Sequence, residues 1–154
     1  MIDTGDRLPP FELPDQDGKK RTFRDLTGKK GLILYVYPKD DTPGCTVEAT
    51  DFRDLAPELD ELGYNVVGIS KDGATSHCKF RDKYDLPFSL LTDEDASYLG
   101  EIGAFGEKKM YGRVSQGIIR STFVTDAEGT LTGVHRNVRA KGHAERIARE
   151  LRKE

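Results

Sequence analysis

The chain has 154 residues, of which 36% are hydrophobic and 33% are charged, and its formal net charge is −3. This length is typical of one domain, which we place at residues 1–154, with enough apolar residues for one core. No long Lys/Arg block and no apolar run of roughly 20 residues is present, so we expect neither nucleic-acid nor membrane binding. Two cysteines and a polar, acidic opening disfavour a secreted disulfide scaffold, and a cytoplasmic location is expected.

The first third of the chain predicts a short strand and turn over residues 9–19 and a brief helical or turn element over Phe23–Leu26. A run of apolar, β-prone residues then predicts a buried strand over Leu32–Tyr37. From Pro43 the pattern becomes helical, and Gly63 is a natural residue to end that helix. Apolar residues of this helix recur at spacings of three and four: Phe52, Leu55, Leu59 and Leu62.

The middle of the chain alternates strands with helices. Asn65–Ser70 is predicted as a strand and Ala74–Tyr84 as a helix with Phe80 on its apolar face. Phe88–Thr92 is predicted as a further strand, and Glu94–Leu99 as a short helix.

The last third predicts a β-hairpin and a terminal helix. Strands over Gly117–Thr125 and Leu131–Asn137 flank the turn-forming residues 126–130, and a helix follows from Gly142. Strands that alternate with helices and end in a hairpin indicate an α/β fold with a mixed sheet. In such folds, sites lie at the carboxyl ends of the strands.

Cys45 lies where the predicted buried strand ends and the predicted long helix begins. Backbone N–H groups at a helix start have no intrahelical partner, and together with the helix dipole they favour a thiolate over a thiol. A cysteine at a helix start is by itself more often a small buried apolar residue than a nucleophile. The surrounding motif decides between the two interpretations.

The segment from Pro38 to Cys45, Pro-Lys-Asp-Asp-Thr-Pro-Gly-Cys, resembles the Pro-x-x-x-Thr-x-x-Cys active-site motif of peroxiredoxins. The wider string from Tyr37 to Ala49 is similar to the bacterioferritin comigratory protein branch, also called peroxiredoxin Q. About 75 residues downstream, Gly117 to Val124 resembles the strand that delivers the arginine of that family, here Arg120.

Two shorter strings extend the resemblance over almost the whole chain. Gly106 to Gly112 is similar to a string common in this branch, and Gly5 to Gly18 resembles its N-terminal hairpin. The fold implied is thioredoxin-like, with a central mixed sheet flanked by helices and an N-terminal hairpin. The activity implied is the reduction of hydrogen peroxide and organic hydroperoxides.

The resemblance implies a role for each residue of the motif. Cys45 attacks the peroxide as a thiolate and becomes a sulfenic acid. The Thr42 hydroxyl holds the peroxide and the sulfur in line, and Arg120 supplies fixed, charged donors to both. Pro38 shields the site from bulk water. Glu48 either orients Arg120 or only complements the helix dipole.

The resolving cysteine is where this chain departs from many relatives. Those relatives carry it five residues after the first cysteine, where this chain has Thr50. Other members of the branch carry it in the helix predicted over Ala74–Tyr84, so Cys78 is expected to resolve Cys45. Cys78 lies roughly 200° around that helix from Phe80, which predicts that it faces solvent. A disulfide would then require local unwinding around Cys45, Cys78 or both.

Thioredoxin or a similar dithiol is the expected reductant, no cofactor or metal is expected, and the chain is expected to be a monomer. His77, His135 and His143 do not cluster with the cysteines in sequence, which disfavours a zinc site. Two alternatives stay open: a one-cysteine cycle completed by an external thiol, and a non-enzymatic peroxide sensor. A disulfide reductase is disfavoured, because it would need a Cys-x-x-Cys pair and only Cys45 follows the strand. A Cys–His hydrolase is disfavoured, because the sequence offers no motif for a histidine that meets Cys45.

Overall fold

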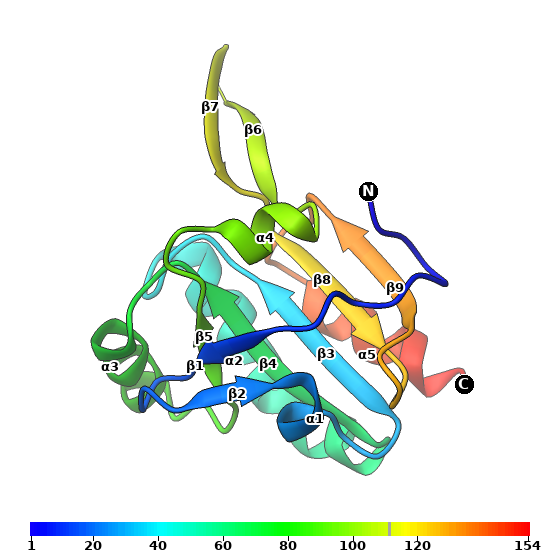
Figure 1. The fold of residues 1–154 in the computed structure, drawn as a ribbon. Helices are drawn as coiled ribbons and strands as arrows, with labels where there is room; N and C mark the ends of the chain where they lie inside the picture. The colour runs from blue at the N-terminus through cyan, green and yellow to red at the C-terminus, as the bar shows by residue number, and fades with distance from the viewer. Residues whose placement is uncertain (111) are drawn as a thin grey trace.

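The structure is a computed structural model, and it describes residues 1–110 and 112–154 (Figure 1). Its centre is a five-stranded sheet formed by β3 (Gly31–Val36), β4 (Tyr64–Ser70), β5 (Leu90–Thr92), β8 (Ser121–Thr125) and β9 (Leu131–Arg136). The strands lie in the order β5-β4-β3-β8-β9. β3, β4 and β5 run parallel, whereas β8 is antiparallel to β3, and β9 to β8. The predicted mixed sheet is confirmed.

The central strand β3 is buried at all of its residues because helices or loops cover both faces of the sheet. Ile33 and Tyr35 point to one face, where they pack with side chains from α2 (Pro43–Glu61), α3 (Ala74–Tyr84) and α5 (His143–Arg152). Leu32 and Leu34 point to the other face, because successive side chains of a strand alternate. In Figure 1, α2 and α5 lie behind the sheet and α1 (Phe23–Leu26) lies in front of it.

The predicted N-terminal hairpin is present as β1 (Glu12–Pro14) and β2 (Lys20–Thr22), which pair antiparallel. Asp15 begins the turn between them. Its carboxylate accepts the backbone N–H groups of Asp17 and Lys19, at 2.9 and 3.0 Å. The turn therefore projects its next residue, Gln16, toward α3 and β5, where its contacts matter below.

The two long central helices begin and end close to the predicted residues. α2 begins at Pro43, whose fixed φ suits the first helical position, and it ends before Gly63, whose φ of 95° few other residues adopt. α3 spans the predicted Ala74–Tyr84. α4 (Ser97–Glu101) starts later than predicted, because Asp95 binds the N–H of Ser97 and fixes the turn before the helix.

A second hairpin was not predicted. β6 (Phe105–Met110) and β7 (Arg113–Ile118) pair antiparallel and project away from the central sheet (Figure 1). The string from Gly106 to Gly112 lies in this hairpin, and its Tyr111 falls outside the described residues.

The prediction of one strand over Gly117–Thr125 was wrong. The chain leaves the hairpin at the end of β7 and enters the central sheet as β8, so the β-prone run serves two sheets. At the break, the N–H of Ile119 donates to the Ala104 carbonyl at 2.8 Å, and the Arg120 carbonyl accepts from the N–H of Val138 at 3.0 Å. Arg120 therefore lies in a bend between strands rather than within one.

None of the helices in the described part of the chain is long and apolar enough to cross a membrane.

Candidate active site

Cys45 lies in the first turn of α2, at the end of the sheet where β3 gives way to a loop over residues 37–42. It is 1% exposed and is one of two free cysteines. Gly44 and Cys45 follow Pro43 in the first helical turn, where backbone N–H groups have no acceptor within the helix. The junction predicted from the sequence is confirmed, and it holds the sulfur in a site shielded from bulk water.

Arg120 is brought to Cys45 by the pairing of β8 with β3. Val36, the last residue of β3, pairs with Ser121, so the residue before Ser121 lies beside the start of the active-site loop. The Nη2 atom of Arg120 lies 3.3 Å from the Sγ atom of Cys45. The guanidinium is therefore placed to stabilise negative charge on the sulfur.

Glu48 holds the other side of the guanidinium. Its Oε1 atom accepts a hydrogen bond from Nη1 of Arg120 at 2.6 Å, and the carboxylate is fully buried. The orienting role considered from the sequence is thereby favoured over a simple dipole effect. One planar cation bridges a carboxylate and a sulfur, which a lysine could not do with the same geometry.

Burial and the neighbouring charges set the ionisation of Glu48 and Arg120. Burial raises the pKa of Glu48 to about 7, even though Arg120 lowers it. Burial alone would lower the pKa of Arg120, but the neighbouring Glu48 and Cys45 raise it, so the guanidinium stays charged. The site thus keeps a fixed cation next to a buried carboxylate that titrates near neutral pH.

Gly44 is a site residue whose role the sequence did not reveal. A Cβ atom at this position would lie 3.2 Å from Nη2 of Arg120 and 3.7 Å from the Cβ of Ala140. The missing side chain lets the guanidinium approach Cys45 closely. Only the three-dimensional approach of Arg120 identifies this constraint, because the two residues are distant in sequence.

Thr42 is the residue immediately before α2, but its side chain makes no capping bond. Its hydroxyl instead donates to the carbonyl oxygen of Lys39 at 2.9 Å. The oxygen of that hydroxyl keeps its lone pairs to accept a further hydrogen bond. Pro38 is half-buried near the start of the same loop.

Cys78 lies in α3, as predicted, but the prediction that it faces solvent was wrong. It is half-buried, and its thiol donates to the carbonyl oxygen of Gln16 at 2.9 Å. Helix geometry correctly placed it away from Phe80. The sequence could not show that the turn after β1 covers this side of the helix.

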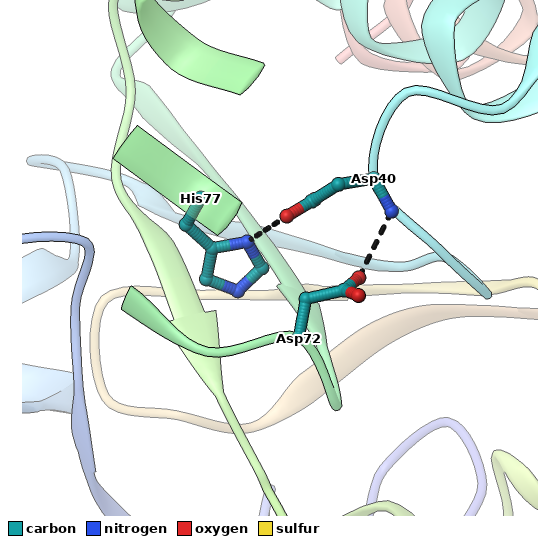
Figure 2. Close-up of side chains that lie close together, drawn as sticks. All are labelled: Asp40, Asp72 and His77. Atoms are coloured by element: carbon teal, nitrogen blue, oxygen red, sulfur yellow. Dashed lines mark hydrogen bonds and ion pairs between the residues drawn. The ribbon is translucent and has the colours of Figure 1, made fainter. Parts of the chain in front are cut away.

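A buried polar cluster beside the loop was also missed. His77 lies against Asp40, and Asp72 binds the backbone N–H of Asp40 (Figure 2). One ring nitrogen of His77 and one carboxylate oxygen each of Asp40 and Asp72 lie within 4.8 Å of one another, a spacing that could hold a metal ion. The contact of His77 with the Asp40 carboxylate, and the bond from the Asp40 backbone N–H to Asp72, already account for the grouping. No local sequence signal marks it, because Asp40 and His77 are 37 residues apart.

Together these residues form a site for chemistry at a sulfur. A shielded cysteine at a helix start faces a charged, anchored guanidinium, which can stabilise negative charge that develops on or near the sulfur in a transition state.

Comparison with known proteins finds relatives that match most of the chain. A family model described as the AhpC/TSA family matches residues 4–134. A Mycobacterium tuberculosis protein named as a peroxiredoxin is 46% identical over 96% of this chain and 93% of its own length. Peroxiredoxin Bcp of Bacillus subtilis is 39% identical, covering 98% of this chain and 96% of that protein.

A solved structure of a related protein has the same fold as this chain. The bacterioferritin comigratory protein of Xanthomonas campestris, described for its alkyl peroxide reduction activity, aligns with a TM-score of 0.87 at 36% identity. The alignment covers 98% of each chain.

Proposed function

Since the chain belongs to the AhpC/TSA family, as a thiol peroxidase of the Bcp peroxiredoxin type, we propose that Cys45 is its peroxidatic cysteine and that Cys78 resolves the oxidised sulfur. The contact between Arg120 and Cys45, anchored on its far side by Glu48, is the observation that carries the proposal. It gives this sulfur, and not that of Cys78, a fixed cationic partner.

In the first step the Cys45 thiolate attacks one oxygen of a hydroperoxide. An S–O bond forms and the O–O bond breaks, so the sulfur is oxidised to a sulfenic acid and the peroxide is reduced. The leaving oxygen takes a proton and departs as water or an alcohol. Negative charge spreads over the breaking bond, where the Arg120 guanidinium can stabilise it.

Thr42 and Pro38 act on the substrate side of this step. Because the Thr42 hydroxyl donates to Lys39, its oxygen is free to accept the O–H of the incoming peroxide. That hydrogen bond would orient the peroxide for in-line attack. Pro38 keeps the loop closed against bulk water. Hydrogen peroxide and alkyl hydroperoxides are the proposed substrates, in line with the activity described for the Xanthomonas protein.

In the second step Cys78 attacks the sulfenic sulfur. A disulfide forms, the S–O bond breaks, and the oxygen leaves as water with the thiol proton. Both cysteines lie in helices, so part of α2, α3 or both must unwind to bring their Cα atoms within about 7 Å. Thioredoxin or a similar dithiol then reduces the disulfide. A monomer in the reducing cytoplasm is sufficient for this cycle.

A one-cysteine cycle is the second candidate. The observation that favours it is the engagement of Cys78 with the Gln16 carbonyl, which holds the thiol in the folded helix. An external thiol would then reduce the sulfenic acid directly. A peroxide sensor would use the same first step but would oxidise once and stop.

Intact mass after one equivalent of hydrogen peroxide tests the proposal. Loss of two hydrogens is expected, since the two thiols should become one internal disulfide. Gain of oxygen without hydrogen loss would contradict the resolving role. A Cys78→Ser variant should lose thioredoxin-dependent turnover while still consuming one equivalent of peroxide. Full turnover by that variant would favour the one-cysteine cycle.

A further inference from the structure

The active-site loop is tied to α3 by the carboxylate of Asp40. This residue lies between Pro38 and Thr42, and its side chain is 3% exposed. Its Oδ2 atom lies 2.8 Å from Nδ1 of His77 and accepts from the Ser76 hydroxyl at 2.8 Å. Both partners belong to the first turns of α3, so one buried carboxylate joins the loop that shapes the peroxide site to the helix that carries Cys78.

His77 is held from both sides of its ring. Its side chain is fully buried, and Nε2 lies 3.0 Å from the Leu91 carbonyl oxygen of β5. A carbonyl oxygen can only accept, so Nε2 carries a proton. One further proton lies between Nδ1 of His77 and Oδ2 of Asp40. Whichever of these two atoms carries it, the hydrogen bond is strong, because no water competes for it in this buried site.

The loop side of this contact has further hydrogen bonds, from Tyr37 and to Asp72, and the Tyr37 hydroxyl also lies 3.3 Å from Nδ1 of His77. The Tyr37 hydroxyl donates to Oδ1 of Asp40 at 2.6 Å, and the Asp40 N–H donates to Asp72 at 2.9 Å. Asp72 in turn accepts from the Ser70 hydroxyl at 2.8 Å. Figure 2 shows that Asp40 approaches His77 and Asp72 from the loop before α2. The buried tie between the loop and α3 therefore runs through the side chains of Ser76 and His77. A second, exposed tie runs from Asp41 to Lys83 and Tyr84, at 2.8 Å each, where water competes for the same hydrogen bonds.

Cys78 follows His77 directly in the chain. A movement that carries Cys78 toward Cys45 must therefore displace His77 from its place between Asp40 and Leu91. We propose that the Asp40–His77 contact is a latch that holds α3 folded over Cys78, and that its opening limits the rate at which Cys78 reaches the Cys45 sulfenic acid. Asp40 and His77 are positioning residues in this proposal, which rests on the proposed resolving role of Cys78.

Two substitutions of His77 separate the two sides of the ring. In His77→Asn the amide nitrogen lies near the place of Nδ1 and can keep the bond to Asp40. In His77→Gln it lies near the place of Nε2 and can keep the bond to Leu91, but the bond to Asp40 is lost. Leu131→Val on β9 is the control. It removes a buried methylene group from the core on the opposite face of the sheet, so it tests for effects of a general loss of packing.

The measurement follows one turnover by rapid quench and intact mass, which resolves sulfenic acid from disulfide. We expect the rate constant for disulfide formation to rise about tenfold in His77→Gln, the effect of losing one strong buried hydrogen bond. It should stay within about twofold of the parent in His77→Asn and Leu131→Val. The rate constant for Cys45 oxidation should be unchanged in all three, since the loop keeps its hydrogen bonds with Tyr37 and Asp72.

A companion measurement detects the opening itself. In a Cys45→Ser background, alkylation of Cys78 should also be about tenfold faster with His77→Gln than with His77→Asn. Equal alkylation rates and an unchanged rate of disulfide formation in His77→Gln would overturn the latch. So would equal acceleration in both His77 variants, because a helix that keeps its bond to Asp40 would then open as readily as one that lacks it. If neither the parent nor any variant forms a disulfide, the proposed resolving role of Cys78 is wrong, and the latch proposal fails with it. That outcome is distinct from disulfide formation at an unchanged rate.

Discussion

Replacing Arg120 by lysine tests the central contact of the site. The guanidinium reaches Glu48 through Nη1 at 2.6 Å and Cys45 through Nη2 at 3.3 Å, from one rigid plane. A lysine keeps the positive charge but has one nitrogen on a flexible stem, so it can serve one of these partners at a time. Arg120→Lys therefore removes a preorganised donor from the sulfur or leaves the carboxylate of Glu48 without its partner.

The expected loss is about 100-fold in the second-order rate constant for oxidation of Cys45 by hydrogen peroxide. Removal of one preorganised donor from a transition state typically costs about 2.7–4 kcal/mol, or about 100- to 1000-fold, and the retained charge places this variant at the lower end. The chain contains no Trp, so oxidation is best followed by rapid quench and intact mass.

Two measurements make the result interpretable. Repeating the assay at pH 9, where even an ordinary thiol is largely ionised, separates loss of thiolate from loss of transition-state stabilisation. Glu48→Gln keeps the guanidinium and removes only its anionic anchor, so a smaller loss of about tenfold is expected. A change of less than threefold in Arg120→Lys at both pH values would refute the role assigned to the guanidinium.

Three further results are expected. Thr42→Val should slow peroxide reduction by about 100-fold with little change in stability, whereas Thr42→Ser should keep most activity, since only the hydroxyl is proposed to bind peroxide. The contribution of Glu48 to the free energy of unfolding should fall as pH rises from about 4.5 to about 7, because Glu48 holds its proton to higher pH when folded. In urea titrations, the difference in free energy of unfolding between the parent and Glu48→Gln should therefore change by up to about 3 kcal/mol over this range, and a difference that does not vary with pH would contradict the assignment. Phe52→Ala should destabilise by about 3–5 kcal/mol in urea titrations, because Phe52 is fully buried and its ring centroid lies 4.7 Å from that of Tyr35; a loss below about 1 kcal/mol would contradict that packing.

Local patterns predicted those parts of the fold that local forces determine. α3 has its predicted bounds, and α2 begins at a proline and ends before a glycine in φ > 0, both of which are visible in sequence. The β6–β7 hairpin was missed because its two strands carry few apolar side chains in alternation, and they are held together by pairing with each other. The single strand predicted through Arg120 failed since nothing local marks a change of sheet.

The site divides in the same way. The motif around Cys45 was legible, and so was its pairing with Arg120, through the resemblance of two separate strings. The sequence did not predict that Gln16 covers Cys78 or that Asp40 contacts His77. The first contact joins residues 62 positions apart, and the second joins residues 37 positions apart. Such contacts depend on how finished elements pack, and a single sequence carries no periodic signal for them.

The burial of Cys45 has a consequence for the order of events in the cycle. Cys45 is 1% exposed, so its sulfur can meet the two oxygens of a hydroperoxide group, but not the surface of another protein. If the reductant is a protein dithiol, as proposed above, its electrons must enter through a different sulfur, or wait until the helix around Cys45 has opened. In the proposed cycle, the burial of Cys45 thus separates the two half-reactions in time. The folded enzyme reacts with the peroxide, and only a rearranged enzyme reacts with its reductant.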